Sequence, residues 1–167
     1  MTRVLIVSLL AALAFTVSAQ SASHVAFCTG AQLSGSFAVV LGSAGAGNIS
    51  YRLRLKNHSL RSCSVTGLPA VQLLGRTGKA LPTHVHAAFP GALTAVLVTL
   101  ASGQRAKATA RFSPDVPGVG EGRGQCEPTA YRLRVTARGG GTTTVPVSPV
   151  TPVCEHGALQ FSAFSHA

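Results

Sequence analysis

The chain has 167 residues and a formal net charge of +10, because 14 basic residues stand against only 4 acidic ones. So few carboxylates leave little material for a Ser-His-Asp triad or for paired-carboxylate hydrolysis. The chain has no tryptophan and 2 tyrosines, which disfavours stacking on single-stranded nucleic acid. The charge instead favours anionic partners such as a cell-wall polymer or a membrane surface, and we expect no nucleic-acid partner.

The first residues are typical of an export signal. Arg3 precedes an apolar run over residues 4–17, and small side chains follow in Val17-Ser18-Ala19. The run is about 14 residues long, which is shorter than the roughly 20 that a membrane-spanning helix needs. We therefore predict a cleaved signal peptide at residues 1–19 and one secreted domain at residues 20–167, located outside the cell or in the cell wall. We expect no transmembrane segment after cleavage.

All four cysteines follow this signal, and an exported chain meets an oxidising compartment in which disulfides persist. Four cysteines allow three pairings, and the sequence alone does not choose among them. Their spacing favours Cys28–Cys63 and Cys126–Cys154, because each pair brackets one end of the secreted chain. No C-x-x-C motif is present, which disfavours a zinc site at the cysteines.

Short strands account for most of the secreted chain. Residues 51–55 alternate apolar and basic side chains, with Tyr51, Leu53 and Leu55 on one face, and residues 131–135 repeat this Tyr-Arg-Leu-Arg pattern. Asn57 then closes the first of these strands as a turn residue. Further strands are predicted at residues 33–41, 71–74, 94–100, 105–112, 142–147 and 159–164, with turns at residues 42–48, 67–69, 102–103 and 117–124. Seven or eight strands at this spacing predict an all-β fold, an antiparallel immunoglobulin-like β-sandwich.

Two blocks of sequence carry a resemblance to a known family. The first contains Cys28, the glycine-rich turn at residues 42–48 and the strand that ends at Asn57; the second runs from Cys63 to Leu74. The chain resembles the actinobacterial secreted domain-of-unknown-function family catalogued as 4232, over about residues 28–159. Leu68 and Ala70 replace the aromatic residue and the second glycine of the family pattern. The resemblance implies a two-disulfide β-sandwich of the cell envelope and no catalytic residues.

Two histidines form a candidate metal site. His84 and His86 lie two positions apart, so that both imidazoles would share one face of a strand, as copper or zinc sites can use. The remaining ligands would have to be brought near by folding, and the alternative is a solvated loop or edge strand. We expect no cofactor.

Four arginines form a candidate site for an anionic ligand. If the two repeated strands are neighbours, then Arg52, Arg54, Arg132 and Arg134 form one outward patch. Guanidinium groups suit bidentate recognition of phosphate or carboxylate, although arginines on a sheet can also serve only to keep it soluble. The sequence thus favours a non-enzymatic binding module at the bacterial cell envelope. The alternatives are a secreted effector that contacts other cell surfaces and a metal-dependent or otherwise unrecognised hydrolase.

Overall fold

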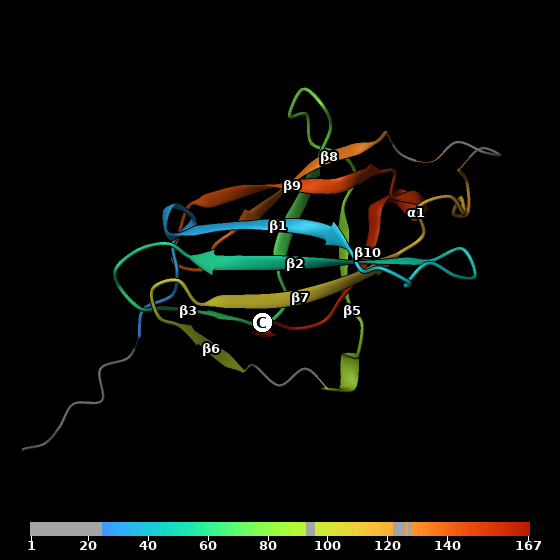
Figure 1. Cartoon of the computed structure of the whole chain (residues 1–167). Helices are drawn as coiled ribbons and strands as arrows, with labels where there is room; N and C mark the ends of the chain where they lie inside the picture. Colours follow the sequence, from blue (N-terminus) through green and yellow to red (C-terminus); the bar gives the residue numbers. More distant parts are fainter. Residues whose placement is uncertain (1–24, 93–95, 122–125, 127) are drawn as a thin grey trace, which may run out of the picture.

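A computed structural model describes residues 25–92, 96–121, 126 and 128–167 (Figure 1). The predicted signal peptide lies outside the described residues. The structure is all-β, as the sequence predicts. Its strands are β1 (Leu33–Val39), β2 (Ile49–Asn57), β3 (Cys63–Thr66), β4 (Ala70–Leu74), β5 (His84–Ala87), β6 (Leu97–Leu100), β7 (Arg105–Phe112), β8 (Ala130–Thr136), β9 (Thr142–Thr151), β10 (Ala158–Phe161) and β11 (Ser165–His166). Three short helical turns accompany them: η1 (Gly30–Gln32), η2 (Pro90–Ala92) and α1 (Cys154–Gly157).

The strands form one nine-stranded sheet in the order β4-β8-β9-β1-β2-β7-β10-β5, with β11 paired to β7, and a small β3–β6 sheet. Strands β1 and β9 are parallel, and so are β10 and β5. The expectation of a wholly antiparallel arrangement is therefore wrong for these two pairs. Each joins segments far apart in the chain, where no hairpin imposes an antiparallel direction. The two-sheet immunoglobulin-like sandwich is not confirmed.

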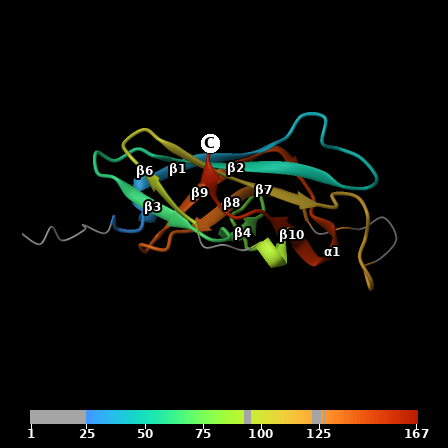
Figure 2. The ribbon, with the colours of Figure 1, turned by 90° about the horizontal axis from the view of Figure 1, so that it is seen from below.

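The large sheet coils until its two edges come close together. Past β4, the chain turns back, and the N–H of Leu81 donates to the carbonyl of Leu73. The hydroxyl of Thr83 accepts from the N–H of Leu73 at 3.0 Å. The next residue begins β5, at the opposite edge of the sheet. This connection hydrogen-bonds to the edge of β4 that no other strand covers, and the sheet is nearly barrel-like as a result. Figure 2 shows β1, β2 and β7 in one layer, with β4 and β10 facing them.

The core follows from the alternation along β2. Tyr51, Leu53 and Leu55 are buried, as predicted, while the residues between them point outward. The ring of Tyr51 lies 5.2 Å from those of Phe37 and Phe112. Strand β7 places Ala106, Ala108 and Ala110 beside these large side chains, and their small size leaves room for the rings.

The hydroxyl of Tyr51 gives a direct test of this packing. It donates to the carbonyl of Pro149 at 3.0 Å, and burial raises the pKa of Tyr51. We expect Tyr51→Phe to cost about 1 kcal/mol in urea unfolding at neutral pH. Because the folded-state pKa is raised, the neutral phenol stabilises the fold below the ordinary pKa of about 10, and that contribution is lost above it. Tyr51→Phe should flatten this alkaline loss; an alkaline loss as steep in Tyr51→Phe as in the native domain would contradict the packing described.

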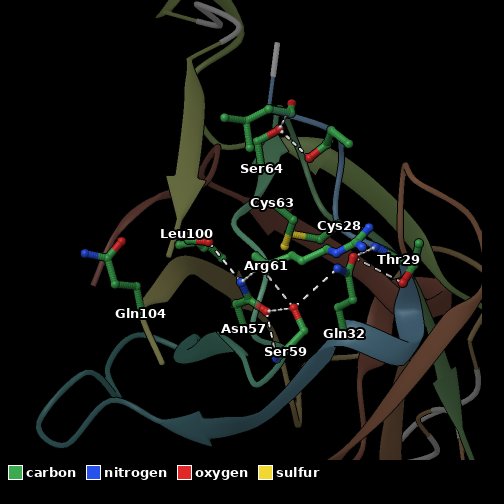
Figure 3. The surroundings of a disulfide bond; sticks show 12 residues. Cys28, Thr29, Gln32, Asn57, Ser59, Arg61, Cys63, Ser64, Leu100 and Gln104 are labelled. Atoms are coloured by element: carbon green, nitrogen blue, oxygen red, sulfur yellow. Dashed lines mark hydrogen bonds between the residues drawn. A yellow bond between two sulfur atoms is a disulfide. The ribbon is translucent and has the colours of Figure 1, made fainter. Parts of the chain in front are cut away.

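The buried amide of Asn57 ties the end of β2 to the first disulfide, Cys28–Cys63 (Figure 3). Its Nδ2 donates to the carbonyls of Arg61 and Leu100 at 2.8 and 2.9 Å. Its Oδ1 accepts from the N–H and the hydroxyl of Ser59. Every polar position of the amide is thus paired, and the loop from Asn57 to Cys63 is fixed in place. The expectation that Asn57 closes the strand is confirmed.

Replacing Asn57 should be costly for this reason. Asn57→Ala removes the donor to the carbonyl of Leu100, whereas the carbonyl of Arg61 keeps the hydroxyl of Ser59 as a donor, and we expect the free energy of unfolding to fall by about 1–3 kcal/mol. The control is Asn48→Ala, since Asn48 is half-buried and its side-chain amide donates one hydrogen bond, to the carbonyl of Ala46 within its own turn. Urea unfolding of both variants checks this; a loss below that of Asn48→Ala would show that the amide does not organise the loop.

Candidate functional site

The four predicted arginines do not form one patch. Strands β9 and β1 lie between β8 and β2, so that about 14 Å of sheet separates the two arginine pairs at the usual strand spacing. The condition that the repeated strands be neighbours is therefore not met. Arg52 and Arg54 lie on β2, Arg132 and Arg134 on β8, and each pair has its own surroundings.

The structure instead brings the β2 arginines beside cations of β7. Arg54 lies directly opposite Lys107, and Lys56 directly opposite Arg105. All four side chains alternate with buried residues, so they share the outward face of the sheet. We call these four residues the basic quartet. Residues 105–107 alternate basic residues and alanine, a pattern that predicts a strand with both cations on one face. No pattern in the sequence indicates that this strand, β7, pairs with β2.

No Asp or Glu side chain forms an ion pair with the basic quartet within the described part of the chain. The described acids are Asp115, Glu121 and Glu155, none of which lies on β1, β2 or β7. The one ion pair among described residues joins Glu121 to His156 at 3.5 Å, outside these strands. Like charges directly opposite each other destabilise a sheet. The quartet is therefore a repulsive arrangement that an anion would relieve.

The surroundings of the quartet suit an extended ligand. Ser34, Gly35 and Ser36 of β1 form the wall of a shallow depression of about 290 Å³ with Arg54, Lys56 and Arg105. These three residues of β1 have short side chains or none, so the longer arginine and lysine side chains project beyond them. Arg52 lies two residues before Arg54 on β2, opposite Thr109 of β7, and is half-buried. Its Nε is buried without a hydrogen-bond partner. The face thus offers a row of cations flanked by hydroxyls.

The β8 pair has a different role in the structure. The Arg132 guanidinium donates to the carbonyl of Arg76 at 2.9 Å, and Arg76 stacks on the ring of Tyr131 with 4.6 Å to its centroid. Arg132 is thereby engaged in holding the turn at residues 75–78. Arg134 is exposed on the outward face, opposite Gln72 of β4.

The two histidines of the candidate metal site share an outward face of β5. His84 and His86 are both exposed, opposite Ala158 and Gln160 of β10. Neither opposing residue can ligate copper or zinc through an imidazole, thiolate or carboxylate. Among the described residues no group of three such side chains gathers anywhere. The described part of the chain also contains no helix long and apolar enough to cross a membrane.

The carboxylate of Glu121 accepts hydrogen bonds from three backbone N–H groups. They are those of Gly118, Glu155 and His156, at 2.6, 2.9 and 2.5 Å. Glu155 and His156 have φ angles of 55° and 56°, in the left-handed region that side chains rarely adopt. The hydrogen bonds from Gly118 and then His156 hold the pKa of Glu121 below its ordinary value. The carboxylate therefore stabilises the turn that follows the second disulfide, Cys126–Cys154.

One comparison with known proteins identifies the family. The family model described as domain of unknown function DUF4232 matches residues 28–165. The chain belongs to this family. No curated protein and no solved structure gives a match. Family membership fits the two disulfides and the β-rich structure, and it assigns no activity to any residue.

The pH dependence of this DUF4232 domain tests the role of Glu121. Because its pKa is lowered in the folded state, the stabilisation is fully present above the ordinary value of 4.5 and is lost as the pH falls below it. We expect the melting temperature to fall steeply on acidification and expect Glu121→Gln to flatten that fall. Glu155→Gln is the charge-matched control, because it leaves the three backbone hydrogen bonds of Glu121 in place. A steep fall retained by Glu121→Gln would contradict the assignment.

Proposed function

We propose that this DUF4232 domain is a non-enzymatic binding module that recognises an anionic polymer of the cell envelope through the basic quartet. The observation that carries the proposal is the pairing of Arg54 with Lys107 and of Lys56 with Arg105 across two adjacent strands, with no Asp or Glu side chain among the described residues of these strands. A structure maintained only for stability gains nothing from like charges set opposite each other.

The geometry favours a polymer over a compact ion. Cations on adjacent strands stand about 5 Å apart, and those two residues apart on one strand stand about 7 Å apart. Such a grid presents several guanidinium and ammonium groups to successive charges of one chain. Phosphodiester or uronic-acid repeats match it, because guanidinium groups bind phosphate and carboxylate in a bidentate manner.

A membrane surface is the less favoured partner. Proteins that insert into a bilayer interface combine cations with apolar side chains. The exposed large apolar side chains of the described residues lie on loops, on β6 and, for Val150, on β9, and none lies on β2 or β7; they are Leu41, Leu60, Phe89, Val96, Leu97, Val116, Val119 and Val150. The two strands that carry the quartet therefore offer no exposed large apolar side chain to enter a bilayer.

Location outside the cell belongs to the same proposal. It is supported by the two disulfides, which persist in oxidising compartments, and by the export signal predicted at residues 1–19. The immunoglobulin-like arrangement stays a hypothesis. The effector and hydrolase alternatives also stay hypotheses, without an observation among the described residues that favours either.

Two charge-matched variants test the proposed site. Arg54→Glu with Lys107→Glu reverses the centre of the quartet, and Arg132→Glu with Arg134→Glu reverses the β8 pair, with the same change in net charge. Binding to purified teichoic acid should weaken at least tenfold in the first variant, a loss of about 1.4 kcal/mol, and much less in the second. Binding should also weaken as salt rises, because salt screens exposed charges.

Three outcomes would count against the proposal. Equal losses in the two variants would mean that net charge alone drives association. Full binding by the quartet variant would show that Arg54 and Lys107 are not part of the binding site. Tight binding to vesicles that contain phosphatidylglycerol, with none to teichoic acid, would make the partner a membrane surface.

A further inference from the structure

The interior of the sheet opens into an apolar hollow that the proposed function does not use. It measures about 350 Å³ and lies on the inner side of β2, opposite the basic quartet. Its walls come from separate strands, with Leu33 of β1, Leu55 of β2, Val65 of β3 and Val135 of β8, all buried. Phe164 closes it near the end of the chain.

Small residues line part of this hollow, namely Gly67, Ala70 and Ala137. Gly67 has a φ of 69°, so the turn between β3 and β4 requires glycine there. Concave apolar sites with a few polar groups at the entrance are typical of small-molecule sites.

One fixed cation stands at the entrance. The Arg138 guanidinium lies over the ring of Phe27, 4.6 Å from its centroid, which holds the side chain at the rim. Among the residues that the structure describes, Arg138 is the one charged residue that lines the hollow. The hydroxyls of Ser64 and Thr66 there already donate to backbone carbonyls. The entrance thus offers one positive group above an apolar interior, which is the complement of a carboxylate on a hydrocarbon chain.

The volume limits the length of that chain. At about 30 Å³ for a water-sized group, the hollow holds roughly a dozen heavy atoms. We propose that it binds a free medium-chain fatty acid, with the hydrocarbon between Leu55, Val135 and Phe164 and the carboxylate at Arg138. A phospholipid with two long acyl chains exceeds the volume. This proposal concerns a different face from the basic quartet, so either can fail without the other.

The test uses decanoate, which has twelve heavy atoms, below the concentration at which it aggregates. Titration of the secreted chain, followed by methyl NMR, should shift the methyl groups of Leu33, Leu55, Val65 and Val135. Decanol should bind at least fivefold more weakly, because it has no charge for Arg138. Butyrate should not bind, because its chain is too short to fill the hollow. Unshifted methyl groups of Leu33, Val65 and Val135, or no binding at millimolar decanoate, would overturn the proposal.

Two variants separate the parts of the site. Arg138→Gln should reduce decanoate affinity to that of decanol, while Arg134→Gln, at an exposed position outside the hollow, should keep the native preference. Val65→Phe should fill the hollow and abolish binding of both ligands. If Val65→Phe does not fold, the Arg138→Gln comparison and the methyl shifts decide the question. Equal preference for decanoate in Arg138→Gln and the native chain would refute the role of Arg138.

Discussion

The register of β2 between β1 and β7 is the constraint on which the rest of the structure depends. Side chains alternate faces along a strand, so a slip of one residue would turn Tyr51, Leu53 and Leu55 to solvent and bury cations. The native register instead completes the aromatic core on one side and opposes Arg54 to Lys107 on the other. Core and basic face are therefore two consequences of one alignment.

The end of β2 is where this alignment is fixed. Asn57 bonds to the loop that leads to Cys63 and to the carbonyl of Leu100, while its own N–H donates to Gln104 at the start of β7. The disulfide from Cys63 to Cys28 then secures the segment that enters β1. A buried amide with all its positions paired is specific in geometry, since any slip would leave several groups unsatisfied. Glu121 holds the turn beside the second disulfide in a comparable way.

The features that the sequence predicted correctly are those that depend on local patterns of residues. The period-two alternation at residues 51–55 gave the strand and its buried face, and the cysteine spacing favoured the two bridges that are present. It could not give the order of strands, because that depends on contacts between distant segments. The repeated Tyr-Arg-Leu-Arg pattern suggested neighbouring strands, yet β2 and β8 are separated by two others. Lys107 was missed as a site residue for the same reason, since only the pairing of β7 with β2 places it opposite Arg54.

If the quartet is kept for binding despite its cost in stability, Lys107→Glu tests this most directly. The substitution sets a carboxylate opposite Arg54 in place of a like charge. It should raise the free energy of unfolding in urea by about 0.2–1 kcal/mol, as opposite charges across two strands do, and it should weaken binding to teichoic acid. A variant that is more stable and binds less well is the result that the account predicts. Unchanged binding, or a loss of stability, would contradict it.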